Sequence, residues 1–283
     1  MKSVLLYRWP SRRGYFIDGL APDAGYLPAF AGDTCEEVLE RLQDVRETFL
    51  FHLDCTFTTN FPAGRLELLA ELSRMGVQVL NGYVTNISKK YIQQFNCDHG
   101  FPDVSVAESG DPDEMLIVKS NYNSFGRTEL RLSKWGQDVL GFKQPEIPSV
   151  GLEYRVIPRS HVDPADWSNP ALVCERFVTN PDGIWYRVSV RRPKIVIRQF
   201  RCSNAIKRPS KSTVDRIFWL GGAPSISSGV EALVWRFVEA FQLDFGAIDV
   251  VTDEHGVATV IDVNHTPFHS SHDPEILSFL RED

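Results

Sequence analysis

Residues 245–267 read FGAIDVVTDEHGVATVIDVNHTP and predict a β-hairpin. Two runs rich in β-branched residues flank the polar turn Asp253-Glu254-His255-Gly256, whose glycine can adopt the positive φ of a tight turn. Because a four-residue loop sets the register, we expect Thr252 to pair with Val257 and Asp249 to pair with Val260. This register decides which side chains share a face of the hairpin.

Three oxygen-bearing side chains are predicted on one face of this hairpin. Side chains alternate along a strand and paired residues share a face, so Asp249, Asp262 and Asn264 should project to the same side. Carboxylate and amide oxygens are the ligands that a hard cation such as Mg²⁺ prefers, with other positions left to water or phosphate oxygens. The alternative interpretation is a two-stranded sheet edge whose polar residues face water.

Length, composition and charge limit the class of protein. The 283 residues suffice for one large unit or two to three small ones, and 43% hydrophobic and 24% charged residues are typical of a globular chain. A net charge of −7 argues against nucleic-acid or anionic-membrane binding, and no apolar run reaches the ~20 residues of a membrane span. Five scattered cysteines without a CxxC pair, and no signal peptide, predict a cytoplasmic protein.

The N-terminal third alternates predicted strands and helices, which indicates a parallel α/β layer. Thr34 and Glu37 form a capping box that should begin a short helix. In a second helix, Leu66, Leu69 and Leu72 are predicted to face the core, with Leu68 as a further candidate. The expected strands are residues 3–7, 48–53 and 77–81, and the second helix is residues 63–75.

Lysines mark two segments in the middle of the chain. A helix predicted at residues 86–95 carries Lys89 and Lys90, whose simplest interpretation is solvated surface charge. Lys119 ends a strand predicted at residues 115–119, where its ammonium group could meet a phosphate. The loop that follows, residues 120–127, has small polar residues but one glycine, so it is a weak match to a phosphate-binding loop.

A basic segment follows in the last third of the chain. Ten lysines or arginines and one acid occur between Arg187 and Arg216. Strands at residues 184–190 and 195–202 would place Arg187 opposite Arg198, and directly opposed like charges are destabilising unless an anion lies between them. The segment therefore predicts a site for a triphosphate or an acidic substrate, and a solvated positive surface is the alternative.

Taken together and in order, these segments resemble the ATP-grasp superfamily, and most of all its carboxylate–amine ligases. Examples are D-alanine–D-alanine ligase, glutathione synthetase and the enzymes that add glutamate to protein tails. The segments read LIVKSNYNSFGR at 116–127, LVCERFV at 172–178, and FGAIDVV and VIDVNHTP in the hairpin. The leading segment LLAELSRMGVQVLNGYVTNISKK, residues 68–90, resembles the pre-ATP-grasp domain and first lysine helix of the family.

This resemblance implies a mixed α/β and α+β fold. An N-terminal pre-ATP-grasp α/β domain would span residues 1–84, ahead of two α+β halves that enclose the nucleotide. The central subdomain, residues 85–178, would hold the lysine strand and the phosphate loop. The C-terminal subdomain, residues 179–283, would hold the basic hairpin and the metal hairpin.

The resemblance also assigns roles to individual residues. Lys119 matches the strand lysine that contacts phosphate, and either Lys89 or Lys90 matches the helix lysine. Glu175 would accept from the adenine amine, and Phe177 and Val178 would offer backbone groups. Asp182 matches a ribose ligand, and Asp249, Asp262 and Asn264 match the ligands of two Mg²⁺ ions, with Mn²⁺ as an alternative. Spacing assigns Arg187 and Arg201 to catalysis, whereas strand alternation favours Arg198 over Arg201.

The implied activity is an ATP-dependent ligation. A small-molecule or peptide carboxylate would become an acyl phosphate, and an amine would then attack it to give an amide, ADP and phosphate. Dimers are common among such ligases, so a homodimer is a further expectation. Two other functions stay open: a nucleotide-binding module without ligase activity, which the glycine-poor loop favours, and a small-molecule kinase.

Two departures from the family leave the substrates undetermined. Phe268 follows Pro267 where many ligases have glycine, and Ala247 stands where several dipeptide ligases carry an arginine. Because the implied chemistry needs no side-chain nucleophile, Cys174 and Cys202 are predicted to be packing residues.

Overall fold

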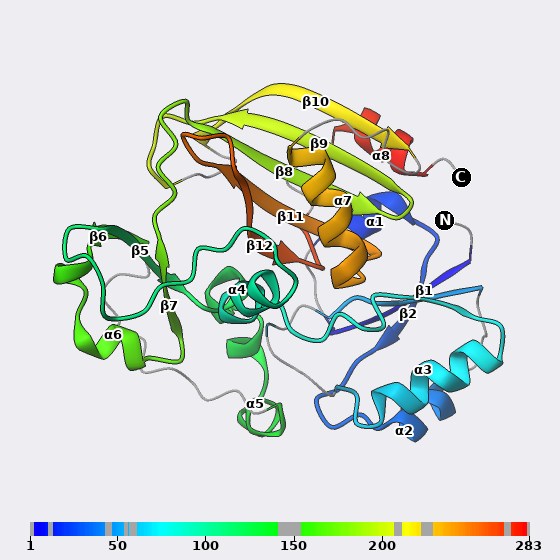
Figure 1. Ribbon diagram of the computed structural model, residues 1–283. Coiled ribbons are helices and arrows are strands. Elements are labelled where there is room, and N and C mark those ends of the chain that lie inside the picture. The colour runs from blue at the N-terminus through cyan, green and yellow to red at the C-terminus, as the bar shows by residue number, and fades with distance from the viewer. Residues whose placement is uncertain are drawn as a thin grey trace.

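Three β-sheets and the helices around them make up the described part of the chain (Figure 1). The computed structural model describes residues 3–10, 14–42, 47–53, 56, 61–140, 154–206, 211–221, 229–268 and 273–281. In Figure 1 a four-stranded sheet lies at the lower right, a three-stranded sheet at the left and a five-stranded sheet along the top. None of the helices in these ranges has both the length and the apolar character to cross a membrane.

The N-terminal layer is a parallel sheet in the order β2-β1-β3-β4, which confirms the predicted α/β layer. Its strands are β1 (Val4–Arg8), β2 (Gly25–Pro28), β3 (Thr48–Phe51) and β4 (Gln78–Leu80). The helices are α1 (Phe16–Leu20), α2 (Cys35–Arg41) and α3 (Arg65–Arg74), with α2 and α3 packed in one apolar cluster and α1 in another. The Thr34–Glu37 capping box is present at α2, whereas β2 and α1 were not predicted.

The predicted core face of α3 is wrong at one residue. Leu66 is 69% exposed, whereas Leu68, Leu69 and Leu72 are buried. The helix begins at Arg65, whose guanidinium group is buried and donates to the backbone carbonyls of Phe61, Asn81, Gly82 and Val84. The buried stripe therefore starts at Arg65 and recurs three, four and seven positions later, which leaves Leu66 on the solvent side.

The three-stranded sheet is antiparallel in the order β6-β5-β7. Its strands are β5 (Met115–Ser120), β6 (Arg155–Pro158) and β7 (Leu172–Arg176), and the short helices around it are η1 (Asn123–Gly126), η2 (Glu129–Arg131), α5 (Lys134–Val139), η3 (Arg159–His161) and α6 (Pro164–Ser168). Helix α4 (Lys89–Asp98) precedes this sheet and starts at Ser88, whose hydroxyl accepts from the Tyr91 N–H. Its neighbour in space is the last strand of the five-stranded sheet.

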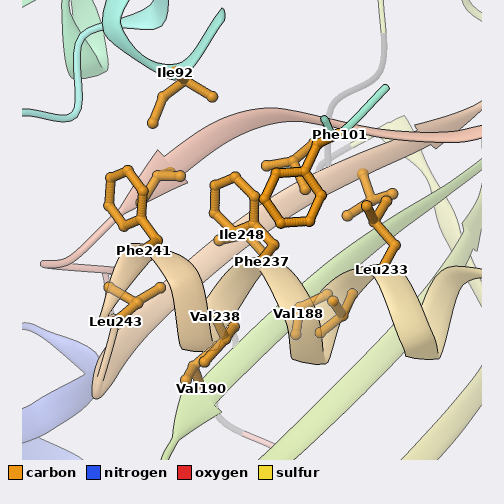
Figure 2. Packing of buried hydrophobic residues seen from close by; sticks show 14 of the residues in the cluster. Ile92, Phe101, Val188, Val190, Leu233, Phe237, Val238, Phe241, Leu243 and Ile248 are labelled. Carbon is orange, nitrogen blue, oxygen red and sulfur yellow. The ribbon is translucent and has the colours of Figure 1, made fainter. Parts of the chain in front are cut away.

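The five-stranded sheet is antiparallel in the order β10-β9-β8-β11-β12. Its strands are β8 (Ile184–Arg191), β9 (Lys194–Arg201), β10 (Thr213–Gly221), β11 (Phe245–Thr252) and β12 (Ala258–Asn264), and the helices are α7 (Val230–Phe241) and α8 (Pro274–Arg281). Helix α7 packs its apolar stripe into an extended core with this sheet and α4. Figure 2 shows Phe237 and Phe241 of α7 in this core with Ile92, Phe101 and Val188.

The predicted β11–β12 hairpin is confirmed, but its register is wrong. Asp249 pairs with Asp262 and not with Val260, because five residues separate the paired ends of the strands and a β-bulge at Ile261 adds one more. The bulge turns Val260 into the core, where it is 1% exposed. It also leaves Asp249, Asp262 and Asn264 on one face, as the sequence predicted.

One buried asparagine joins the N-terminal layer to the five-stranded sheet. Asn81, directly after β4, accepts from the backbone N–H groups of Asp244 and Phe245 and donates to the Phe245 carbonyl. Its own N–H donates to the Asp244 carboxylate. The side chain is 0% exposed and the residue has a φ of 56°, a left-handed conformation that asparagine tolerates better than most residues.

We predict that Asn81→Ala destabilises the protein by about 2–4 kcal/mol, because two buried N–H groups lose their acceptor. Urea denaturation measures the free energy of unfolding. Leu66→Ala is the matched control, since this exposed side chain should change stability by less than about 0.5 kcal/mol. Equal stability of the two variants would show that the Asn81 contacts do not hold these layers together.

Candidate functional site

Four charged side chains lie side by side across the five-stranded sheet. Asp262 of β12 pairs with Asp249 of β11, Asp249 pairs with Arg187 of β8, and Arg187 pairs with Arg198 of β9. Paired residues share a face, so two carboxylates and two guanidinium groups form one row. We call these four residues the charged row. The predicted opposition of Arg187 and Arg198 is confirmed.

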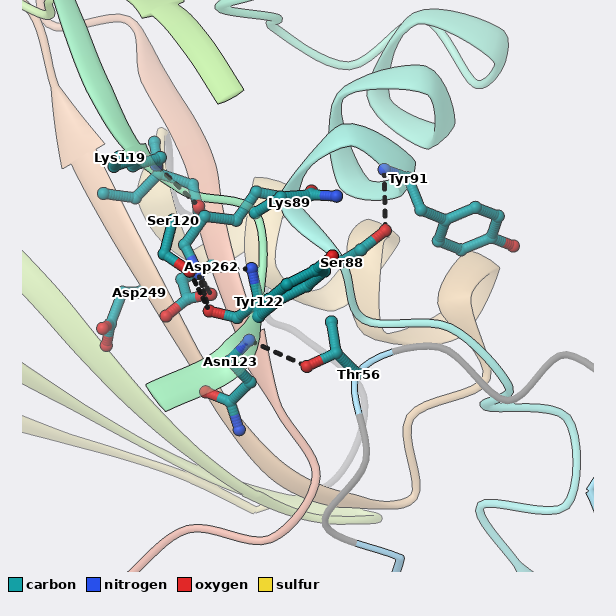
Figure 3. Close-up of polar contacts among 12 residues, drawn as sticks. Thr56, Ser88, Lys89, Tyr91, Lys119, Ser120, Tyr122, Asn123, Asp249 and Asp262 are labelled. Carbon is teal, nitrogen blue, oxygen red and sulfur yellow. Dashed lines mark hydrogen bonds and ion pairs between the residues drawn. The ribbon is translucent and has the colours of Figure 1, made fainter. Parts of the chain in front are cut away.

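The charged row lines a cavity of about 320 Å³. Lys89 of α4 enters the cavity from the opposite side, and its Nζ lies 3.3 Å from Asp262 Oδ1. Arg187 Nη1 lies 3.7 Å from Asp249 Oδ2, which makes a second ion pair across the row. Figure 3 draws Lys89, Asp262 and Asp249 together with the loop residue Asn123, which also lines the cavity.

Burial and neighbouring charges shift the titration of this cluster. Burial raises the pKa of Asp249, a rise that Arg187 opposes and Asp262 increases. Burial alone would lower the pKa of Lys89, but Asp262 and other nearby groups raise it above its ordinary value. Burial and then Arg187 lower the pKa of Arg198 to about 10. The acidic end of the row is thus suited to a cation and the basic end to an anion.

The oxygen atoms at the acidic end fit a hard cation. Asp249 Oδ1 and Asp262 Oδ1 are buried and have no hydrogen-bond partner among the residues that the structure describes. Asn264 Oδ1 accepts from the Thr266 N–H and adds an amide to the set. The described ranges contain no group of three or more His, Cys, Asp or Glu side chains that could hold a metal alone. A cation here would therefore need further ligands such as water or phosphate oxygens.

A smaller, mostly apolar cavity of about 90 Å³ adjoins the first one. Lys119 and Glu175 contribute its charges, with Lys119 Nζ 2.5 Å from Glu175 Oε2. Phe177 and Val178 also line it, but the Phe177 N–H already donates to the Met115 carbonyl. Lining by apolar side chains with few polar groups suits an aromatic ring. Tyr154 lines both cavities and marks where they meet.

The two cavities follow the direction of strand β11. Val251 lines the small cavity, Asp249 belongs to the charged row, and Ala247 lines the far part of the large cavity. These residues are two positions apart on one face, which corresponds to steps of roughly 7 Å. A ligand with a flat apolar part and an anionic tail would fit along this line.

Loop 120–127 approaches the charged row and is fastened on two sides. The Asn123 N–H donates to the Thr56 hydroxyl, and the Thr56 N–H donates to the Glu129 carboxylate (Figure 3). Ser124 and Phe125 have φ values of 47° and 62°, which are uncommon for residues other than glycine. The loop thus brings Asn123 and Ser124 into the large cavity despite its single glycine.

Most of the residues that the sequence singled out lie at the two cavities, and three do not. Lys90 is exposed, and its Nζ donates to the Asn169 carbonyl, whereas Lys89 is 2% exposed and faces Asp262. Asp182 is exposed in the turn before β8 and lines neither cavity. The residues brought to the cavities are Lys89, Lys119, Glu175, Phe177, Val178, Arg187, Asp249, Asp262 and Asn264.

The predicted position of Arg201 at the site is also wrong. Arg201 is 53% exposed and forms an ion pair with Asp215 at 3.4 Å. The β8–β9 register continues without a bulge from Arg198 to Arg201, so the three-residue offset turns Arg201 to the other face. Strand alternation had favoured Arg198, and Arg198 is the arginine in the cavity. Tyr154 was missed, because no strand or helix pattern surrounds it.

Comparisons with solved structures find one fold over nearly the whole chain. The ATP-grasp ligase PsnB in complex with a minimal precursor has a TM-score of 0.55 and 13% identity, with 95% of this chain and 93% of that chain covered. The L-amino acid ligase from Bacillus licheniformis has a TM-score of 0.52 and 12% identity, with 99% and 72% covered. N5-carboxyaminoimidazole synthetase from Staphylococcus aureus has 0.50 and 12%, with 100% and 78% covered.

No protein-family model and no curated protein matches the sequence. At identities this low, the likeness to the solved structures shows the fold alone.

The buried Lys119–Glu175 pair generates a prediction about stability. Glu175→Leu should destabilise the protein by about 3–5 kcal/mol, because Lys119 keeps its charge without a partner. The double variant Lys119→Met/Glu175→Leu should recover most of this loss, since it removes both charges and keeps the volume. Urea denaturation of the four proteins in this cycle measures the coupling. Additive losses in the double variant would contradict a direct pairing.

Proposed function

This chain has the ATP-grasp fold, and from that premise we propose that it is an ATP-dependent ligase that joins a carboxylate to an amine. The observation that carries the proposal is the charged row, because it sets a cation site and an anion site side by side in one cavity. We further propose the division of the chain at residues 84 and 178 that the sequence suggested.

The two cavities support a specific orientation of ATP. We place the adenine ring in the small apolar cavity beside Glu175, and the phosphates toward Lys119, Lys89 and the charged row. Lys119 and Lys89 are both nearly fully buried, so their charges act on the phosphates with little screening by solvent. PsnB has been solved with a minimal precursor, Mg and ADP, and its fold resembles that of this chain at a TM-score of 0.52.

The metal part of the proposal rests on the unpartnered carboxylate oxygens. Asp249, Asp262 and Asn264 would hold Mg²⁺, as two ions in the arrangement that we propose, with Mn²⁺ as an alternative. When bound, such a cation neutralises phosphate oxygens and stabilises the charge that develops in phosphoryl transfer. Arg187 pairs with Asp249 at 3.7 Å and so also faces the phosphate end of the cavity.

The proposed reaction has two steps. A carboxylate oxygen of the donor attacks the γ-phosphorus of ATP, ADP leaves, and an acyl phosphate forms. An amine then attacks the acyl carbon, loses a proton and expels phosphate to give the amide. Arg187 and Arg198 would screen the repulsion between the donor carboxylate and the γ-phosphate, which is the main electrostatic barrier to their encounter.

No side-chain nucleophile is required, and the buried cysteines agree with that. Burial raises the pKa of Cys174 to about 11, so its thiol stays protonated. Cys202 is buried and its thiol donates to the Lys211 carbonyl. Solved relatives include PsnB with its precursor peptide PsnA2 and an L-amino acid ligase, so we propose a peptide or a small molecule as the carboxylate, together with an amine acceptor.

A single assay tests the proposed function. The protein is incubated with ATP, MgCl₂, a pool of carboxylic acids and either hydroxylamine or a pool of amines. ADP together with a hydroxamate or an amide supports the ligase. ADP with a phosphorylated product and no condensation identifies a kinase, and ATP binding without any ADP release identifies a nucleotide-binding module that does not ligate.

We predict that Asp262→Asn lowers ADP release by at least about 100-fold, because it weakens the cation that stabilises the transferring phosphate. Addition of EDTA to the wild-type protein should have the same effect. Glu254→Gln is the matched control, since Glu254 lies on the same hairpin but is exposed in its turn. Magnesium-dependent ADP release at near wild-type rate in Asp262→Asn would overturn the metal assignment.

The two candidate arginines provide a paired prediction. Arg198→Gln should reduce kcat/KM for the carboxylate by about 100-fold and leave KM for ATP nearly unchanged, since a charge-assisted contact is lost near the reacting groups. Arg201→Gln should stay within about twofold of wild type, because only an exposed ion pair is lost. Steady-state kinetics with both substrates varied measures the two effects. The opposite ranking would restore the assignment of Arg201.

A further inference from the structure

The far part of the large cavity differs in chemistry from the charged row. Ala247 of β11 and Ser189 of β8 pair with each other and lie two positions beyond Asp249 and Arg187 on the same face. Their small side chains leave space above the sheet next to the charged row. This part of the cavity is the end that points away from the apolar slot at Val251.

Aromatic side chains from two distant segments wall this space. Phe16 of α1 lines the cavity and stacks on Phe245, two positions before Ala247 on the same strand. Phe268 lines it from the segment after β12 and stacks on Tyr15 with ring centroids 5.5 Å apart. We call Phe16, Ser189, Ala247, Pro267 and Phe268 the apolar compartment.

Backbone contacts fix the two walls relative to each other. The Phe16 N–H donates to the Pro267 carbonyl at 2.8 Å, and Tyr15 and Phe268 form a β-bridge. The compartment is thus built where the N-terminal layer meets the end of the metal hairpin. A ligand here would enter a preformed space and would not need to order these segments.

Arg198 supplies the anchor at the boundary of this compartment. Its side chain is 6% exposed, and its Nε has no hydrogen-bond partner among the described residues. Arg187, in contrast, is engaged with Asp249. A carboxylate held by Arg198 would lie next to the phosphate end of the charged row, with its body directed over Ala247 and Ser189.

We infer that the apolar compartment receives the body of the carboxylate donor and selects an acid whose chain is uncharged and apolar. This inference rests on the proposed ligase function, whose site it extends. The residues of the compartment carry no charge, so a second carboxylate or an ammonium group on the donor would be buried without a partner. An apolar chain instead gains about fourfold in affinity for each methylene group that it buries.

Three acids of equal chain length test this inference. Pentanoate, glutarate and 5-aminopentanoate end in a methyl group, a carboxylate and an ammonium group. Their Kd values are measured by ligand-observed NMR with the full chain, MgCl₂ and a non-hydrolysable ATP analogue. We expect pentanoate to bind at least about tenfold more tightly than the other two. Tighter binding of either charged acid, or no binding of pentanoate, overturns the inference.

Two variants locate the binding in the compartment. Ala247→Leu should weaken pentanoate binding at least about tenfold by filling the floor. Phe268→Ala should weaken it about fourfold or more by removing a wall, and it covers the case in which Ala247→Leu fails to fold. Binding of the ATP analogue should change less than twofold in both variants. Unchanged pentanoate binding in a folded variant places the acid elsewhere and overturns the inference.

Failure of the inference can be separated from failure of the proposed function. Hydroxamate formation from ATP, hydroxylamine and each acid is measured in parallel with binding. Selective pentanoate binding without any hydroxamate or ADP would refute the ligase and keep the compartment. Hydroxamate formation from glutarate or 5-aminopentanoate in preference to pentanoate would keep the ligase and refute the selectivity.

Discussion

The structure of the site depends on one electrostatic constraint: four charges are held on one sheet face with little access to solvent. Like charges are adjacent at both ends of the charged row, since Asp262 pairs with Asp249 and Arg187 pairs with Arg198. The central Arg187–Asp249 pair and the buried Lys89 offset part of this repulsion. What they leave uncompensated is a demand for a cation at one end and an anion at the other, which is the preorganisation that phosphoryl transfer requires.

Periodic patterns in the sequence predicted much of this arrangement. Alternation along β-branched runs identified both hairpins, and strand alternation correctly opposed Arg187 with Arg198. The bulge at Ile261 could not be predicted, because one extra residue in a strand leaves no mark in composition. Arg201 was misplaced because spacing taken from a family was preferred to strand alternation. Leu66 was misplaced because an arginine, Arg65, occupies the first buried position of its helix.

The choice between Lys89 and Lys90 shows where sequence reasoning ends and packing begins. Both residues lie in the first turn of α4, and neither composition nor helix periodicity separates them. The loop after β5 does, because Asn121 accepts from both backbone N–H groups with its carbonyl and its side chain. These contacts fix the rotation of the helix start, which directs Lys89 to Asp262 and leaves Lys90 at the surface.

The linear order along β11 explains how the proposed activity and the proposed selectivity can vary separately. Val251 contacts the apolar slot, Asp249 the charged row and Ala247 the apolar compartment. Each step is two residues on one face, so a substitution at Ala247 changes the space for the donor without moving the carboxylate at Asp249. The compartment is also closed by Phe16 and Phe268, which lie outside both strands of the hairpin. Donor selection is therefore set by residues that the nucleotide does not need.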